Sequence, residues 1–477
     1  MFHAGRPRGP SILVLHLVFG WCLLTAALPG STIFGIAWSL GLIAFFYGLT
    51  RSVRQRSLLF VALIATQMLG FRTPVGYLTP VQLLASILVA EYLLRAAVSR
   101  RGGHLPRFVR TQSLIGVMLI GQAAASIGLS PIVAPSMMPW IRFSTLVAAY
   151  LVVLAVLGSE QSPGPLMKAL GLQLYFFLLV VLYQNYLFPP PLESRVEAWF
   201  DYGGRLRISN VLVCYMAGSV PCLLAFWDYR KPLIFGSIAI FSLLGLYLSR
   251  SRMGFVILAA DLLLCGRYLA ARRRFVQALA LILLLAAVAP LVLSAVGKRR
   301  AQDPMEQSGL RRWYAAVSHV QTFLAYPMTG VGFGMWARKH ELGLGQMIDI
   351  AQLPNGEIAS MNAHNLLLRV AADMGLPGVV LLVAFWAHAA WICFGRKRKP
   401  WGQYDRDGLV SRVLFVNLLL LSTFGDYLEN GFFWTCAVGM LLIAQIGREG
   451  ETPGGPAGSG SVLPSFEARG GVEARGN

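Results

Sequence analysis

Long, continuous hydrophobic runs separated by short polar gaps dominate the chain. Three of these runs are Leu233–Leu248, Phe275–Leu293 and Val379–Phe394. A helix needs about 17–25 mostly apolar residues to cross a bilayer, and runs without alternation favour helices over the strands of a barrel. The pattern predicts about fourteen spans, at residues 12–28, 33–49, 57–71, 79–98, 112–130, 141–158, 166–187, 209–227, 233–248, 253–270, 275–293, 376–394, 409–425 and 432–447.

The composition supports a membrane protein rather than a soluble one. Hydrophobic residues make up 56% of the 477 residues, and charged residues only 13%. An average soluble domain carries roughly a quarter charged residues. The predicted fold class is therefore all-α: a polytopic transmembrane helical protein of about 12–14 spans, with one large helical loop outside the membrane.

The formal net charge of +20 is explained by membrane topology, so no nucleic-acid partner is expected. Basic residues cluster in alternate gaps, as in Arg51/Arg54/Arg56, Arg272–Arg274 and Arg396–Lys399. Cytoplasmic loops of membrane proteins carry an excess of Lys and Arg. This rule places both termini in the cytoplasm, and it places the long segment 294–375 on the opposite side.

Cysteine usage and the N-terminus add two negative expectations. The six cysteines all lie in predicted spans, and none has metal-ligand spacing, so we expect neither a disulfide framework nor a metal site, and no cofactor. Arg6 and Arg8 precede an apolar run that begins at Ile12. This start resembles a retained first anchor more than a cleaved signal peptide.

The polar segments divide the chain into four parts. Residues 1–293 form N-terminal transmembrane helices, and residues 294–375 form a large loop with amphipathic helices on the side opposite the cytoplasm. Residues 376–447 form the C-terminal transmembrane helices. Residues 448–477, rich in Gly, Pro, Ser and charge, form a disordered cytoplasmic tail.

The outside loop 294–375 is too long for a simple connection, which suggests a functional segment. Ser308 can cap a helix that runs to about Ala325 and lies along the outer membrane surface. Its apolar stripe recurs at helical spacing, and it consists of Trp313, Val317, Val320 and Leu324.

Two further features follow that helix in the loop. The glycine-rich stretch Gly330–Gly334 predicts a close-packed turn beneath the helix, because no strand precedes it to build a nucleotide site. A second short helix is predicted after Asn362. It ends at Gly375, and Pro377 begins the next span.

The outside face also collects arginines where the topology rule predicts few. The guanidinium group is always charged, and its planar fork fits phosphate oxygens. The set can therefore bind a lipid-linked diphosphate; the alternative is that these side chains only reach from span ends to the lipid headgroups. The arginines are Arg205, Arg207, Arg250, Arg252, Arg311 and Arg312.

His364 is the candidate general base, because a histidine with an ordinary pKa of ~6.5 accepts a proton at neutral pH. His319 and His340 lie in the same loop and are rival candidates. The alternative for His364 is a packing or helix-end role. Two acidic residues lie within predicted spans: Glu91 is near enough to the inner end to reach water, whereas Asp261 is deeper and can pair with a neighbouring helix.

Three stretches resemble the O-antigen ligase and O-antigen polymerase family of bacterial membrane glycosyltransferases. They cover about residues 249–394, and their spacing is more specific than any one of them. The first is Ser251-Arg252-Met-Gly-Phe, and the second runs from Ser308-Gly-Leu-Arg-Arg312 to Gly334. The third is His364-Asn365, nine residues, and then Gly375-Leu-Pro-Gly378, which resembles the ligase signature closely.

The resemblance implies a membrane-embedded, all-helical glycosyltransferase of the bacterial inner membrane, with its active site facing the periplasm. Its donor is a glycan linked to undecaprenyl diphosphate, and no metal takes part. The resemblance makes His364, Arg312 and Arg252 the catalytic residues: His364 takes the acceptor proton, and the two arginines hold the diphosphate. The proposed substrate-binding residues are Arg311, Arg250, Arg205, Arg207, Asn365 and His319.

The acceptor stays open between lipid A–core, a growing polysaccharide, and Ser or Thr of an exported protein. The family usually has fewer spans than predicted here, the segment around Arg205 matches it only loosely, and Val379 stands where many ligases have glycine. These departures leave ligase and polymerase as alternatives. A lipid-linked glycan flippase is the competing class; it predicts polar residues along a path at mid-membrane, whereas here polarity concentrates in one outside loop.

Overall fold

The computed structural model describes seven long segments of the chain and a short ribbon. The described residues are 80–98, 105–132, 137–158, 199–201, 205–207, 305–336, 365–395, 406–424 and 431–449, with single positions at 57, 175, 178, 179, 182, 256, 257, 259–261, 263, 264 and 342. Most of the remaining predicted spans, and nearly all of the predicted cytoplasmic tail, lie outside them.

Six described helices coincide with predicted spans, which confirms an all-α polytopic membrane protein. They are α4 (Pro80–Val98), α5 (Arg107–Gly128), α6 (Met138–Leu157), α13 (Leu366–Phe394), α14 (Arg406–Phe424) and α15 (Gly431–Glu449). Within the described residues, α5, α6 and α13 are long and apolar enough to cross a membrane. Shorter apolar stretches lie in α14, at Gly408–Thr423, and in α15, at Cys436–Gln445.

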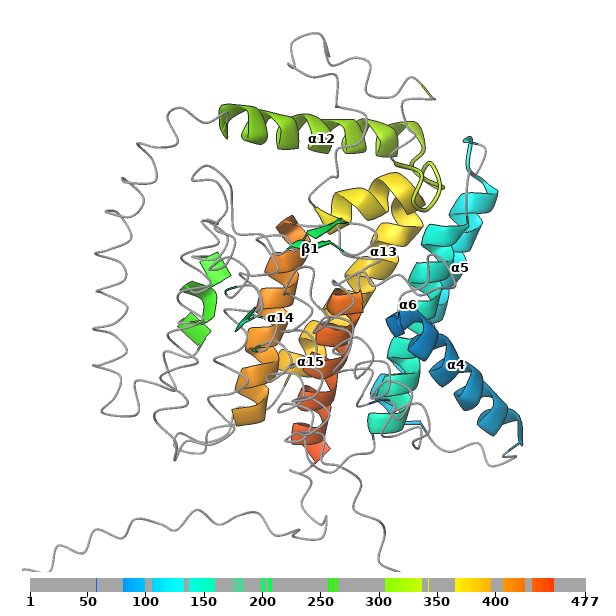
Figure 1. Ribbon diagram of the computed structural model, residues 1–477, viewed down its shortest axis with the longest axis vertical. Coiled ribbons are helices and arrows are strands. Elements are labelled where there is room, and N and C mark those ends of the chain that lie inside the picture. Colours follow the sequence, from blue (N-terminus) through cyan, green and yellow to red (C-terminus); the bar gives the residue numbers. More distant parts are fainter. Residues whose placement is uncertain are drawn as a thin grey trace, which may run out of the picture.

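Helix α13 is central to the described bundle. It packs against α5, α14 and α15, while α6 packs against α4, α5 and α15. The seventh described helix, α12 (Met305–Ala325), packs on α13 and lies across one end of the bundle (Figure 1).

Aromatic side chains lock α6, α13 and α15 together. Tyr150 on α6 and Phe385 on α13 both pack on Trp434 of α15, with ring centroids 5.3 and 5.8 Å away. The Tyr150 hydroxyl donates a hydrogen bond to Gln112 Oε1 on α5 at 3.0 Å. Phe143, on α6, lies 4.9 Å from Phe333 of the loop after α12, so the bundle core continues into that loop.

The only described strands form one short antiparallel ribbon of β1 (Trp199–Asp201) and β2 (Arg205–Arg207). In its register Arg205 pairs with Asp201 and Arg207 with Trp199. This hairpin was not predicted for the segment 188–208, but six residues do not change the fold class.

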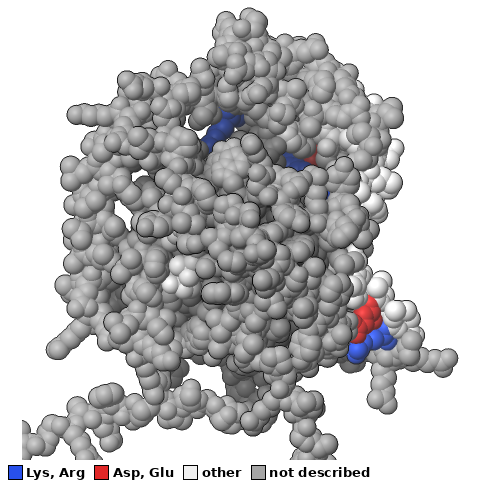
Figure 2. Space-filling view, viewed as in Figure 1, with Lys and Arg blue, Asp and Glu red and all other residues white. Residues whose placement is uncertain are grey.

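The two intramembrane acids both have nearby polar partners. Asp261 is buried, and its Oδ2 accepts a hydrogen bond from Asn417 Nδ2 on α14 at 3.3 Å, so the predicted pairing with a neighbouring helix is confirmed. Glu91 forms an ion pair of 2.7 Å with Arg95, one helical turn further along α4. On the face shown in Figure 2, described charged side chains are few and scattered.

Candidate functional site

Helix α12 carries the first half of the candidate site. The predicted helix from Ser308 to about Ala325 is confirmed, and it begins slightly earlier, at Met305. The backbone leaves the helix at Tyr326, and Pro327, which cannot continue it, follows. Arg311 and Arg312 therefore lie in the first half of α12, and the Arg312 side chain is exposed.

The predicted apolar stripe of α12 faces away from the bundle. Trp313 is 65% exposed and Leu324 68% exposed. The buried positions instead carry small or polar side chains, namely Ala315, Ser318, His319 and Thr322. Interfaces between helices of membrane proteins favour small and hydrogen-bonding residues, which explains why the apolar positions did not mark the buried face. That α12 lies along the outer membrane surface stays a prediction.

His319 is enclosed between α12 and the loop that follows it. Its side chain is fully buried, and Nδ1 donates a hydrogen bond to the carbonyl of Ala315 at 2.7 Å. The imidazole ring lies 5.6 Å from the Trp336 ring. His319 thus has a packing role in this arrangement, and contact with a substrate would require it to become accessible.

The loop after α12, Gly330–Trp336, docks on the side of α13. Gly330, Gly332 and Gly334 have φ angles of 65°, 107° and 75°, which L side chains rarely adopt. At Gly330 an added Cβ would lie 2.4 Å from the carbonyl carbon of Asp373, so glycine permits the close approach. The backbone N–H of Val331 donates to Ala372 O at 2.9 Å, and that of Gly332 to Asp373 O at 3.1 Å. The predicted close-packed turn is confirmed.

Helix α5 holds the other side of this loop with a row of polar side chains. Ser126 Oγ accepts a hydrogen bond from the Phe333 N–H at 3.1 Å, and Ser130 Oγ donates to the Val331 carbonyl. Gln122 Nε2 donates to Met374 O on α13 at 3.0 Å. Through these contacts α5 fixes the loop and the upper part of α13 together.

Helix α13 carries the second half of the candidate site at its start. Asn365 caps the helix: its Oδ1 accepts a hydrogen bond from the Leu368 N–H at 3.0 Å, and its Nδ2 lies 3.4 Å from Thr423 O on α14. His364 directly precedes this cap and lies outside the described residues. The capping contact holds the chain at the point where His364 is attached.

A kink divides α13 where the sequence predicts one helix to end and the next to begin. Gly375 has φ 69° and ψ −166°, and Pro377 follows inside the helix. A Cβ at Gly375 would lie 2.7 Å from Met328 O, and the Leu376 N–H donates to Pro327 O at 2.7 Å. The kink therefore lets the turn after α12 approach the backbone of α13.

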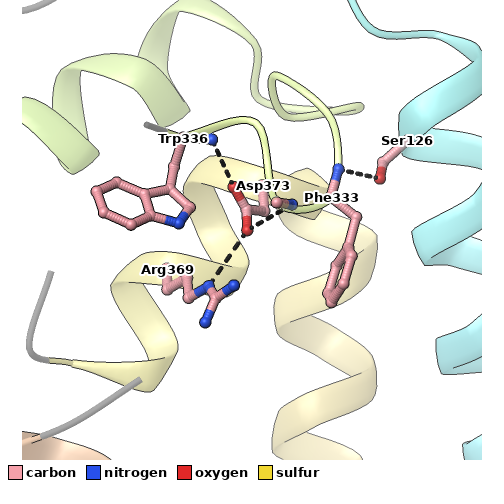
Figure 3. A network of polar contacts seen from close by, with 6 residues as sticks. Ser126, Phe333, Trp336, Arg369 and Asp373 are labelled. Carbon is pink, nitrogen blue, oxygen red and sulfur yellow. Dashed lines mark hydrogen bonds and ion pairs between the residues drawn. The ribbon is translucent and has the colours of Figure 1, made fainter. Parts of the chain in front are cut away.

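One carboxylate ties these elements together. Asp373 is 1% exposed, and its two oxygens accept hydrogen bonds from separate loop N–H groups: Oδ2 from Gly334 at 3.1 Å and Oδ1 from Trp336 at 3.2 Å. Arg369 Nε, also buried, lies 3.4 Å from Oδ2 (Figure 3). A buried charge needs such compensation, because removing it from water is costly.

The structure places some of the predicted site residues on two helices that are in contact and leaves others undescribed. Arg311, Arg312, His319 and Asn365 all lie on α12 or at the start of α13, two helices in contact. Arg205 and Arg207 are in β2. The predicted residues outside the described part are Arg250, Arg252 and His364.

Sequence reasoning missed Asp373 and the polar row on α5. Asp373 lies inside the nine-residue gap of the His-Asn…Gly-x-x-Gly pattern, and an acidic residue within an apolar helical run was a signal that it has a partner. Ser126 and Gln122 gave no comparable signal, because uncharged polar residues are ordinary in spans and their partners lie 207 and 252 residues away.

The described elements form a platform of two helices joined by a loop. Exposed Arg312 stands on one helix, the His364 attachment point begins the next, and the glycine loop with Asp373 joins them. Chemically, such a platform can present the cation of Arg312 to a substrate at one end of the helical bundle.

Comparison with known protein families finds a match in the part of the chain that forms this platform. Residues 237–383 match the family described as O-antigen ligase, and this range includes α12, the glycine loop and the first part of α13. No curated protein matches the chain. The similarity of this chain to the O-antigen ligase family thus rests on residues 237–383.

Proposed function

We propose that the protein transfers a glycan from undecaprenyl diphosphate to an acceptor hydroxyl at the periplasmic face of the bacterial inner membrane. The observation that carries this proposal is the match of residues 237–383 to the O-antigen ligase family. A family of this kind supports a glycosyl-transferring enzyme that works on lipid-linked polysaccharide in a membrane.

In the proposed reaction His364 is the general base. Its imidazole takes the proton of the acceptor hydroxyl, whose oxygen attacks the anomeric carbon of the donor sugar. The bond between that carbon and the diphosphate oxygen breaks, and the electron pair leaves with undecaprenyl diphosphate. One base without a carboxylate nucleophile fits a single displacement with inversion. The capped start of α13 supports this role, because it anchors the residue that follows His364.

Arg312 and Arg252 hold the diphosphate and stabilise the negative charge that grows as the sugar–phosphate bond breaks. Fixed positive donors placed where charge develops are a main source of catalytic stabilisation. The exposure of Arg312 on α12 supports this assignment. With two guanidinium groups in this role, the reaction needs no divalent ion.

The other predicted contacts complete the substrate site in this proposal. Arg311, Arg250, Arg205 and Arg207 are basic residues of the outside face that can meet diphosphate or acidic sugars. Asn365 contributes indirectly, since its side chain is used in the helix cap.

The acceptor is lipid A–core if the protein is a ligase and a growing polysaccharide if it is a polymerase. Ser or Thr of an exported protein is the third acceptor class. A flippase for the lipid-linked glycan is the alternative function.

Analysis of lipid-linked glycans in a deletion strain, complemented with the wild-type gene, tests the proposal. Loss of long-chain lipopolysaccharide with full-length glycan on the carrier indicates a ligase. Single repeats on the carrier indicate a polymerase. Accumulation of the carrier-linked glycan on the cytoplasmic side would contradict glycan transfer and favour the flippase.

A further inference from the structure

Asp373 joins the two helices that carry the proposed base and the proposed diphosphate ligand. We infer that Asp373 is a positioning residue, which fixes the His364 end of α13 relative to Arg312 on α12. The inference rests on the proposed function and assigns that site a residue that does not itself touch substrate.

The Asp373 side chain is hydrogen-bonded to the glycine loop. Its two carboxylate oxygens accept hydrogen bonds from the N–H groups of Gly334 and Trp336, at 3.1 and 3.2 Å. The side chain is buried, so water does not compete for these bonds. The loop is thereby held to α13 by a side chain as well as by the backbone bonds of Val331 and Gly332.

The glycine loop in turn contacts α12. The Trp336 ring lies 5.6 Å from that of His319, which is buried on α12. At its other end the loop follows α12 directly, through a turn in which the Gly330 N–H donates to Tyr326 O at 2.9 Å. Both ends of the loop thus contact or continue α12, and a shift of the loop would shift the helix that carries Arg312.

Asp373 and Asn365, the residue that follows the proposed base, lie on the same stretch of α13. Asn365 caps the helix eight residues before Asp373, which corresponds to about 12 Å along a helix axis at 1.5 Å per residue. This stretch is regular helix, since the non-helical residue, Gly375, comes after Asp373. Asp373 and the attachment point of His364 therefore belong to one rigid piece.

Only a carboxylate satisfies this arrangement at position 373. Two separate N–H groups each require an acceptor oxygen, and Arg369 adds a positive charge at 3.4 Å. An asparagine has one acceptor oxygen, and its NH2 group would face the second N–H. Asp373→Asn should therefore break one of the two hydrogen bonds that hold the loop to the Asp373 side chain, while the volume of that side chain stays nearly unchanged.

The experiment measures helix geometry and catalysis in the same full-length protein. Spin labels are placed at Trp313→Cys, beside Arg312, and at Leu367→Cys, near His364, in a background without the six native cysteines; both sites are exposed. Double electron–electron resonance gives the label-to-label distance distribution. The kcat and the KM for lipid-linked donor are measured on the same variants without labels.

We expect Asp373→Asn to broaden the distance distribution and to lower kcat about a hundredfold, with little change in the donor KM. Asp373→Glu keeps the charge and both oxygens, so it should recover part of both properties. If Asp373→Asn does not accumulate in membranes, the same two measurements are made on Asp373→Glu instead. Tyr150→Phe, which removes a buried hydrogen bond away from the loop, is the matched control and should change neither.

An unchanged distance distribution in Asp373→Asn, or a wild-type kcat, would overturn the inference. A failure of the proposed function has a different signature: His364→Ala would remain active while Asp373→Asn still broadens the distribution. In that case the link between α12 and α13 stands, and the assignment of the base fails.

Discussion

The Asp373 carboxylate accepts a hydrogen bond from the Trp336 backbone N–H at 3.2 Å, across 37 residues of chain. This bond joins the first part of α13 to the far end of the loop that follows α12. Since the region matched by the O-antigen ligase family spans both partners, the bond places a structural junction inside the part of the chain expected to do chemistry.

Gly330→Ala should destabilise the protein. The position has a φ of 65°, and a Cβ would lie 2.5 Å from Asp373 O. The backbone conformation alone should cost about 1–3 kcal/mol, with the steric contact in addition. Gly121→Ala on α5 is the matched control, since nothing lies within 4 Å of its added Cβ; alanine should be neutral there or stabilising by up to about 1 kcal/mol. The measurement is the midpoint of thermal unfolding of both variants in detergent. Equal midpoints would contradict the close contact between the Gly330 loop and α13.

Ser126→Ala should loosen the glycine loop from α5. The Phe333 N–H, buried against α5, would lose its acceptor at 3.1 Å, and an unsatisfied buried donor costs about 1–3 kcal/mol. Ser422→Ala is the control: that buried hydroxyl donates only within its own helix, to Leu418 O at 2.8 Å, and its loss should cost about 0.6 kcal/mol or less. The measurement is the rate of limited proteolysis within residues 326–336. Equal cleavage rates in both variants would argue against the hydrogen bond between Phe333 and Ser126 as an anchor of the loop.

Arg312→Lys should impair transfer, roughly tenfold to a hundredfold in kcat, because a point charge does not reproduce the guanidinium fork. Arg95→Lys is the control. Arg95 is largely exposed and pairs with Glu91 on α4, and such surface pairs contribute only about 0–1 kcal/mol to stability. Steady-state rates in proteoliposomes compare the two variants. A wild-type rate for Arg312→Lys would show that Arg312 does not hold the diphosphate.

Chelation of divalent ions should leave transfer intact. In the proposed mechanism, arginines supply the positive charge that a divalent ion supplies in other glycosyltransferases. The assay compares purified enzyme with and without EDTA, followed by Mg²⁺ or Mn²⁺ in excess. Activity that disappears with EDTA and returns with either ion would contradict the arginine mechanism.

Much of the fold follows from local signals in the sequence. The apolar runs predict six of the described helices, three of which are long and apolar enough to cross a membrane, because lipid requires long continuous helices. Ser308–Ala325 becomes α12, and the break at Gly375 appears as the kink of α13. Glycines 330, 332 and 334 predict a tight turn, and they adopt the positive φ angles that such a turn needs.

The orientation of α12 and the junction at Asp373 were not predictable in the same way. Apolar spacing identifies a buried face only when water surrounds the helix; beside a membrane the exposed side can be apolar too. Trp313 and Leu324 are therefore exposed, while His319 and Thr322 are buried. Contacts such as those of Ser126 with Phe333 and Gln122 with Met374 depend on tertiary packing, and no local sequence pattern predicts them.

The most direct test of the account is glycan transfer by purified His364→Ala in liposomes that contain undecaprenyl-diphosphate-linked glycan and an acceptor. His340→Ala, a histidine of the same loop, is the matched control. The account predicts that His340→Ala keeps wild-type transfer, whereas His364→Ala reconstitutes equally well and loses about a hundredfold to ten-thousandfold in rate. Transfer by His364→Ala at the wild-type rate would contradict the proposed base and the mechanism built on it.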